Sequence, residues 1–417
     1  MELKRVVVTG LGALTPIGNT VEEYWNGLLN GVSGAAPITK YDATLFKTKF
    51  ACEVKNFNPE DFLDRKEARK LDPFVHFALA ATDEAVKDSG LEFDKFDTNR
   101  IGVIWGSGIG GLKTFLDEVT NFAKGDGTPR FNPFFIPKMI LDIAPGHISI
   151  KYGLRGPNFS TVSACASSTN ALIDAFNYIR LAMADIIISG GSEAIINEAG
   201  MGGFNAMHAL STRNEDPVTA SRPFDKDRDG FVAGEGAGTI ILEELEHAKA
   251  RGAKIYAELV GGGMSADANH ITAPHPEGLG AKLVMTNALR DAQLTTGDID
   301  YINVHGTSTP LGDISESRAI LDLFGTNAYK LNISSTKSMT GHLLGAAGAI
   351  ESIASILAVK NDIVPPTINH FTDDPEIDPN LNFTFNKAQK REVRAAQSNT
   401  FGFGGHNASV IFKKYTA

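Results

Sequence analysis

Cysteine is nearly absent from the chain, which has only Cys52 and Cys165 among its 417 residues. A disulfide framework is therefore excluded, and the two residues do not form a C-x-x-C metal or redox pair. No apolar run approaches the roughly 18 to 20 residues that a membrane-spanning helix needs. The strand-like run 6–8 leaves no room before it for a secretory signal peptide. These absences predict a cytoplasmic protein with reduced thiols and no membrane insertion.

An excess of basic residues is also lacking, because 39 Lys and Arg residues stand against 49 Asp and Glu, for a formal net charge of −10. Since nucleic-acid binding depends on cations that release phosphate counterions, we expect no nucleic-acid partner. What the chain does have is a globular composition, with 42% hydrophobic residues and enough length for a continuous core. This length suits one large domain or two fused halves.

Short β-branched runs alternate with longer segments of helical spacing. The predicted strands cover 5–8, 101–105, 158–162, 185–189, 239–242, 299–304 and 331–334. The predicted helices cover 75–89, 167–182, 280–292 and 343–360. Several of these strands are almost entirely apolar, which is typical of strands buried on both faces. The pattern predicts an α/β protein whose central sheets are covered by helices.

Two internal echoes suggest a duplication. The segments 104–107 and 304–307 share a strand end, a bulky residue, a glycine and a hydroxyl residue, and the glycine-rich run 8–12 resembles 260–263. Two related halves that join near residue 255 would explain both echoes. The alternative is that strand-to-turn junctions use glycine everywhere.

Three motifs resemble known sites but fail a requirement of each. The run Gly10-Leu11-Gly12 lacks the third glycine of a dinucleotide-binding fingerprint. The segment 225–230 imitates a calcium loop, but Gly236 occupies the twelfth position, where a bidentate Glu is needed, so we expect a salt-bridged surface turn. The segment 190–194 lacks the second glycine of a serine-hydrolase elbow. The ten histidines also show no metal-ligand spacing, and no metal site is predicted.

Cys165 is the first candidate for chemistry. It lies where a strand-like run ends and a helical run begins, among small Ala and Ser residues. A cysteine at a helix N-terminus feels the positive end of the helix dipole, which favours the thiolate. The alternative is a small buried hydrophobic residue, the ordinary role of a lone cysteine.

Two histidines strengthen this hypothesis. His305 directly follows a predicted strand, at the edge of a sheet where α/β proteins bind ligands. His342 also comes after a predicted strand and opens a helix. Both are flanked by glycine and hydroxyl residues that permit close approach. Taken singly, each could still be an ordinary core histidine.

Two further features add polar chemistry. Glu351 interrupts an otherwise apolar helix, and a buried carboxylate there would need a cation, for which Lys337 is the natural partner unless Glu351 points to water. The run Gly-Phe-Gly-Gly-His-Asn over 402–407 can expose backbone N–H groups. Such groups can donate to an oxyanion during acyl transfer.

In combination, these motifs resemble those of the elongating β-ketoacyl-acyl carrier protein synthases of the thiolase superfamily, and most of all the type II enzymes of dissociated bacterial fatty acid synthesis. The resemblance runs from residue 6 to residue 405. It implies a thiolase-like α/β fold in which two related βαβ-rich halves form five layers, α-β-α-β-α. The implied halves are 1–254, which carries the nucleophilic cysteine, and 255–417, which carries two catalytic histidines.

The resemblance also implies an activity, the decarboxylative Claisen condensation of an acyl thioester on Cys165 with malonyl-acyl carrier protein. His305 and His342 would act on the malonyl group, while Phe403 would gate the site and share an oxyanion hole with Cys165. No cofactor is expected, because phosphopantetheine arrives on the acyl carrier protein. The residues implied as catalytic are Cys165, His305, His342, Lys337 and Glu351.

Other implied contacts concern the substrate and the partners. Phe135 would reach the acyl pocket from the other subunit of a homodimer. The implied substrate-binding residues are Ile109, Phe135, Phe204, Thr272, Thr307, Thr309 and Phe401. The implied carrier-protein docking residues are Lys66, Arg69, Lys70 and Arg130. Charges at i, i+4 over 65–70 would form a cationic helix face, although a solvated surface is the alternative. His208 stands where family members often have Arg.

Related families provide the competing hypotheses. A ketosynthase of a type II polyketide pathway shares the Cys-His-His set and stays open as an alternative. Silent chain-length factors lack the cysteine, and thiolases generally use a second cysteine late in the chain, where this chain has none. Initiating synthases resemble Cys-His-Asn, whereas this chain has His342.

Overall fold

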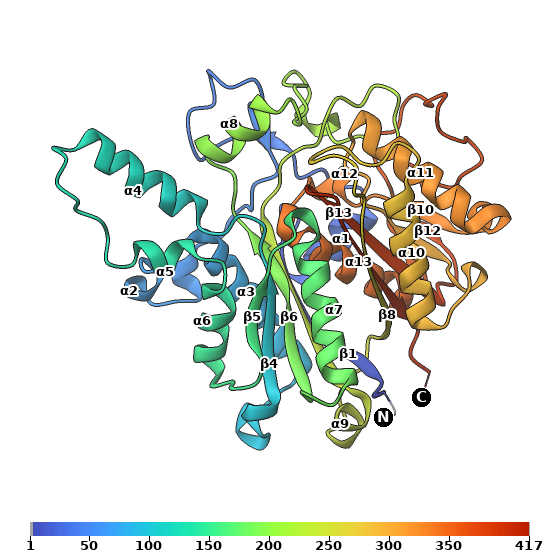
Figure 1. Cartoon of the computed structure of the whole chain (residues 1–417), viewed down its shortest axis with the longest axis horizontal. Coiled ribbons are helices and arrows are strands. Elements are labelled where there is room, and N and C mark those ends of the chain that lie inside the picture. Colours follow the sequence, from blue (N-terminus) through green and yellow to red (C-terminus); the bar gives the residue numbers. More distant parts are fainter. Residues whose placement is uncertain (1–2, 417) are drawn as a thin grey trace.

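The computed structural model describes residues 3–416, in which ten strands form one continuous sheet (Figure 1). The strand order is β10-β9-β13-β14-β8-β1-β7-β6-β4-β5. The strands of the first half are β1 (Val6–Leu14), β4 (Ile101–Gly106), β5 (Asn158–Thr161), β6 (Ile186–Glu193) and β7 (Gly236–Glu244). Those of the second half are β8 (Ala257–Ala266), β9 (Tyr301–Asn303), β10 (Asn332–Ser334), β13 (Ala395–Gly402) and β14 (His406–Lys413).

The two halves have the same topology. Each contains three parallel strands followed by two antiparallel ones: β5, β4, β6, β7, β1 in the first half and β10, β9, β13, β14, β8 in the second. The halves are joined where Val6–Val8 of β1 pair with residues 257–259 of β8. The sequence echoes fall on equivalent elements, the ends of β4 and β9 and the interiors of β1 and β8. The duplication is therefore visible in the fold.

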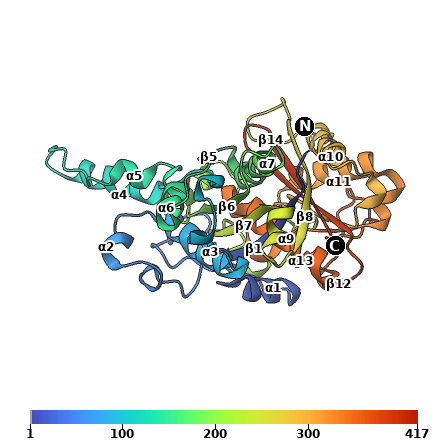
Figure 2. The ribbon, with the colours of Figure 1, turned by 90° about the horizontal axis from the view of Figure 1, so that it is seen from below.

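Helices and sheet halves alternate in five layers (Figures 1 and 2). The outer helices of the first half are α3 (Pro73–Ser89) and α6 (Ile143–Tyr152), and those of the second half are α10 (Leu279–Ala292) and α11 (Pro310–Phe324). The middle layer holds α7 (Ser167–Arg180) and α13 (Ala347–Asn361), packed between the sheet halves. Since α13 is buried all round from Ala347 to Val359, its apolar sequence is that of a central helix. The fold is the predicted α-β-α-β-α arrangement.

Shorter elements complete the chain. The remaining helices are α1 (Val21–Leu29), α2 (Arg65–Ala68), α4 (Leu112–Lys124), α5 (Phe135–Met139), α8 (Glu198–Ala206), α9 (Leu245–Ala250) and α12 (Lys337–Thr340). Short strands pair as β2 (Ala36–Pro37) with β3 (Phe50–Ala51) and β11 (Ile363–Val364) with β12 (Gln389–Lys390). The 3₁₀ turns are Pro59–Asp61, Phe93–Lys95, Thr98–Arg100, Ala164–Ala166, Pro217–Thr219, Thr296–Asp298, Gly325–Lys330 and Leu344–Ala346.

Helices α4 and α5 form an arm that extends away from the body of the molecule (Figures 1 and 2). The arm exposes large apolar side chains, among them Phe115, Phe122, Phe131, Phe134 and Ile136. Exposed apolar surface of this extent is typical of a protein interface.

Two helix predictions need correction. The helix expected over 343–360 begins at Ala347, because a 3₁₀ turn with Leu344 at φ +46° precedes it. The helix expected over 65–70 is a single turn that ends at Ala68, so its charges do not form a continuous cationic face. Within 3–416, none of the helices has both the length and the apolar character needed to cross a bilayer.

Candidate active site

A cavity of about 560 Å³ opens beside the ends of β4, β5 and β9. Loops converge at this edge of an α/β sheet, which is why ligands generally bind there. The residues that are both predicted from sequence and found on the cavity wall are Ile109, Cys165, Phe204, Thr272, His305, Thr307, Thr309, His342, Phe401 and Phe403. The fold thus gathers residues from both halves around one space.

Cys165 lies in the 3₁₀ turn between β5 and α7, and its side chain is almost fully buried. Its Sγ is 3.1 Å from Nε2 of His342, within hydrogen-bonding distance. Burial raises the pKa of the thiol to about 12, while the Lys337 charge and the backbone N–H of Phe403 oppose this rise. Burial thus acts against the thiolate that the helix N-terminus favours, and the protonation state of the resting thiol stays a prediction to be tested.

The two histidine rings come from the second half. Their centroids are 5.2 Å apart and their planes nearly perpendicular. The backbone of His342 donates to the carbonyl of Val232 at 2.8 Å, and the backbone N–H of His305 donates to Glu316 at 3.0 Å. Burial and the charge of Lys337 hold the pKa of both imidazoles well below the usual range. Both rings are therefore neutral at pH 7.

Lys337 and Glu351 form a buried ion pair behind the histidines. Lys337 is on α12, and Glu351 is on α13. Burial raises the pKa of the Glu351 carboxyl to about 7, and the Lys337 charge limits that rise. The alternative in which Glu351 points to water is excluded, because its carboxylate is buried against Lys337.

The glycine-rich turn after β13 packs directly against Cys165. Gly404 and Gly405 have φ angles of +87° and +73°, which favour glycine. A Cβ at Gly402 would lie 2.5 Å from the carbonyl oxygen of Ser163 and 3.2 Å from the amide nitrogen of Cys165. The close approach that this glycine permits brings the Phe403 amide to the thiol. Two backbone donors, those of Cys165 and Phe403, therefore lie beside the sulfur.

Comparison with known proteins agrees with this geometry. The family model of the β-ketoacyl synthase N-terminal domain matches residues 3–248, and that of the C-terminal domain matches residues 256–371. The chain belongs to the β-ketoacyl synthase family. Its relative in Synechocystis sp., 3-oxoacyl-[acyl-carrier-protein] synthase 2, is 51% identical over 415 residues, which cover 100% of this chain and 99% of the relative.

Solved structures of other ketosynthases share the fold. The ishigamide ketosynthase/chain length factor superposes with a TM-score of 0.92 at 35% identity, over 99% of this chain and 100% of that one. A type II polyketide ketosynthase in complex with its acyl carrier protein superposes with a TM-score of 0.89 at 34% identity, over the same shares of the two chains. The thiolase-like fold expected from the sequence is therefore confirmed.

Two buried carboxylates of this β-ketoacyl synthase were missed from the sequence. Glu316 on α11 accepts the backbone N–H groups of His305 and Gly306, at 3.0 and 2.9 Å. Glu193 at the end of β6 accepts those of Gly108 at 2.8 Å, Ile109 at 3.1 Å and Gly345 at 3.0 Å. Glu193 lies in the segment 190–194, which resembles a hydrolase elbow, and Glu316 belongs to no recognisable motif; a carboxylate on a buried helix face or strand end was the only signal for this role.

Five predicted residues lie away from the cavity. Phe135 is on the arm, at the start of α5. Lys66, Arg69 and Lys70 lie on and just after α2, and Lys70 is paired with Glu67 at 2.6 Å. Arg130 is paired with Asp126 at 3.3 Å. Docking of the carrier protein by the four basic residues, and an approach of Phe135 to the acyl pocket of a second subunit, stay predictions.

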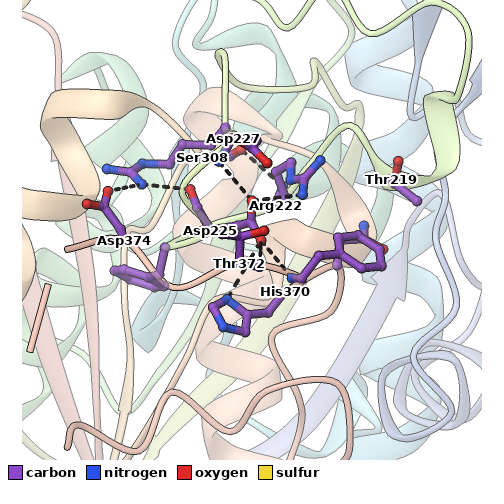
Figure 3. A network of polar contacts seen from close by, with 12 residues as sticks. Thr219, Arg222, Asp225, Asp227, Ser308, His370, Thr372 and Asp374 are labelled. Atoms are coloured by element: carbon purple, nitrogen blue, oxygen red, sulfur yellow. Dashed lines mark hydrogen bonds and ion pairs between the residues drawn. The ribbon is translucent and has the colours of Figure 1, made fainter. Parts of the chain in front are cut away.

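The segment 225–230 also differs from expectation. Its ion pairs exist, among them that of Asp225 with Arg222 (Figure 3), but Asp225 and Arg228 are buried rather than at the surface. The reason is that α11 and the segment around His370 and Asp374 cover them. Among residues 3–416, no group of His, Cys, Asp and Glu is arranged to hold a metal ion.

Proposed function

We propose that this protein is an elongating condensing enzyme, a 3-oxoacyl-[acyl-carrier-protein] synthase of the type II fatty acid pathway. The observation that carries the proposal is the contact of Cys165 with His342, with His305 beside it, inside one cavity. The full-length identity to relatives named 3-oxoacyl-[acyl-carrier-protein] synthase 2 supports the same reaction.

The first step is acyl transfer to Cys165. The thiol attacks the carbonyl carbon of an acyl thioester on acyl carrier protein, forming a Cys165 thioester and releasing the carrier thiol. As the C–S bond forms, the thiol proton can pass to His342 Nε2, which is 3.1 Å away, and from there to the departing carrier sulfur, which leaves the ring neutral again. The backbone amides of Cys165 and Phe403 would stabilise the oxyanion.

The second step forms the nucleophile. Malonyl-acyl carrier protein loses carbon dioxide, and the electron pair of the broken C–C bond forms an enolate. Since both imidazoles are neutral and buried, they can donate hydrogen bonds to the enolate oxygen in a site of low polarity. The enolate carbon then attacks the Cys165 thioester, which releases a product longer by two carbons and the Cys165 thiolate, and a proton taken up from water restores the thiol. The Lys337–Glu351 pair would fix the rings from behind.

Partners follow from this chemistry. The substrate would arrive on an acyl carrier protein, held by Thr307 and Thr309 at the cavity wall and by Lys66, Arg69, Lys70 and Arg130 at the surface. A solved relative was captured with its own carrier protein. The exposed aromatic arm would pack against a second copy, giving a homodimer in which Phe135 approaches the partner's pocket. The reaction would occur in the cytoplasm and use no resident cofactor.

Polyketide ketosynthases provide a second candidate function. The observation that favours it is that structural relatives of this class superpose with TM-scores of 0.89 and 0.92. Their identity to this chain is 34 to 35%, however, against 51% for the fatty acid relatives. Product analysis with primers of graded length distinguishes the two, because a polyketide enzyme would retain unreduced keto groups over repeated extensions.

The decisive experiment uses the two cysteines of the chain. The variant Cys165→Ala should lose condensation completely, whereas Cys52→Ala, at a buried position outside the cavity wall, should keep it. Mass spectrometry after incubation with acyl-carrier thioester should find the acyl adduct on the Cys165 peptide alone. Condensation by both variants at the wild-type rate would refute the proposed function.

A further inference from the structure

A buried polar network lies behind the cavity wall, outside the catalytic set (Figure 3). At its centre, the Asp225 carboxylate accepts the backbone N–H groups of Phe371 at 2.6 Å and Thr372 at 2.8 Å, and pairs with Arg222 at 2.8 Å. These contacts tie the segment 221–230 to the segment 369–374. We call these two joined segments, 221–230 and 369–374, the clasp. The motif over 225–230 is therefore the core of the clasp rather than a metal loop.

The guanidinium of Arg228 connects this clasp to the cavity. Nε donates to the carbonyl of Thr309 at 3.1 Å, and Nη2 donates to that of Pro310 at 2.8 Å. Nη1 donates to the carboxylate of Asp374 at 2.7 Å, and the Asp313 carboxylate lies 3.4 Å from Nε. The side chain is only 2% exposed. A planar fork with fixed donor directions is needed to hold two successive carbonyls at once.

The loop 307–310, whose backbone Arg228 holds, has a strained conformation and lies at the cavity wall. Ser308 has a φ of +69°, which is unfavourable for a residue with a Cβ. Its carbonyl accepts the N–H of Gly230 at 3.1 Å, and its hydroxyl accepts the backbone N–H of residue 222 at 3.0 Å. The flanking Thr307 and Thr309 hydroxyls are 3.0 Å apart and face the cavity. Since strain persists only where surroundings impose it, the segment 222–230 determines where these hydroxyls stand.

We propose that Arg228 is a positioning residue for the substrate arm, which fixes the Thr307 and Thr309 hydroxyls by holding the backbone of their loop. The inference rests on the proposed function, in which these hydroxyls bind the pantetheine amides. Arg228 touches no reacting atom. Its loss should therefore weaken binding of pantetheine thioesters and leave the reactivity of Cys165 unchanged.

Arg222 is the matched control. It is buried to a similar degree and belongs to the same network, but its side chain pairs with Asp225 and stacks on Phe371, with 5.0 Å from the guanidinium to the ring centroid. Its guanidinium thus contacts Asp225 and Phe371 rather than the loop, and its backbone N–H, which donates to the Ser308 hydroxyl, is kept in any variant. A purely structural role of the network would affect Arg222→Lys and Arg228→Lys alike.

The test measures acyl transfer from a carrier-free acyl-pantetheine thioester to Cys165, and separately the alkylation of Cys165 by iodoacetamide. Arg228→Lys keeps the charge but cannot hold both carbonyls, so we expect its KM to rise about tenfold, as for a lost buried charged hydrogen bond. Its alkylation rate should stay within about twofold of the wild type. Arg222→Lys should keep the wild-type KM.

Each result decides the question. An unchanged KM in Arg228→Lys, or an equal rise in both variants, would overturn the inference. If Arg228→Lys does not fold, Asp374→Asn at the outer end of the clasp replaces it, and a raised KM supports the inference whereas an unchanged KM overturns it. The wild-type enzyme distinguishes failure of this inference from failure of the proposed function, because an absence of Cys165 acylation in the wild type would refute the proposed function itself.

Discussion

The protonation state of Cys165 offers a sharp test of the site. Burial raises the pKa of the thiol from the reference of 9.0 to about 12, an electrostatic penalty of about 4 kcal/mol on the thiolate. The N-terminus of α7 returns at most about 2 kcal/mol. The thiol should therefore titrate well above pH 9, and the thiolate should be on the order of one molecule in a thousand or fewer at pH 7.

The assay is the ultraviolet absorbance of the thiolate, measured over pH as the difference between the wild type and Cys165→Ser. We expect no titration step below about pH 9. A step near neutral pH, together with a charged His342, would show a stable thiolate–imidazolium pair and would refute the argument that desolvation dominates. Cys52 cancels in the difference, because both proteins retain it.

Three further perturbations can be checked. Burial raises the pKa of Glu84 to about 7, so the folded state favours the uncharged carboxyl. This preference adds up to about 3 kcal/mol to the free energy of unfolding. The contribution is complete below about pH 4.5 and is lost as the pH rises through 7. Thermal unfolding of Glu84→Gln should therefore depend less on pH between 5 and 8 than that of the wild type, whereas exposed Glu22→Gln should not differ. Gly402→Ala should abolish acylation of Cys165, because the new Cβ meets the Ser163 carbonyl. The control Gly146→Ala, in open space within α6, should raise the free energy of unfolding by about 0.5 to 1 kcal/mol. Equal activity of Gly402→Ala and the wild type would contradict the close approach. Lys70→Glu should raise the KM for carrier protein at low salt and less at high salt, and a salt-independent KM would exclude docking there.

Sequence periodicity was sufficient for the α/β class, whereas the five-layered arrangement followed from the family resemblance. The apolar strands predicted buried sheets, and the segment 347–359 is as buried as its composition suggests. The glycine echoes at 104–107 and 304–307 marked equivalent strand ends. These features are local in the chain, which is why the sequence alone predicts them.

Features that depend on long-range packing were not predictable. The pKa of Cys165 is set by burial that only the assembled halves create. Glu193 receives backbone N–H groups from a loop 85 residues away in the sequence. Asp225 and Arg228 look like surface charges until the segment 369–374 closes over them. In each case the property depends on contacts that form only in the folded structure, so the residue type and its position in the sequence do not reveal it.

The duplicated fold raises the question of why there is a single reaction centre. The turns before α7 and α13 are equivalent, and both begin with a residue at positive φ, Ala164 at +50° and Leu344 at +46°. The middle residue is Cys165 in one turn and Gly345 in the other. A Cβ at Gly345 would lie 2.2 Å from the amide nitrogen of Gly108. One 3₁₀ turn thus carries a reactive side chain, while at the same place in the other the loop at Gly108 leaves no room for one, so the scaffold is repeated but the chemistry occurs once.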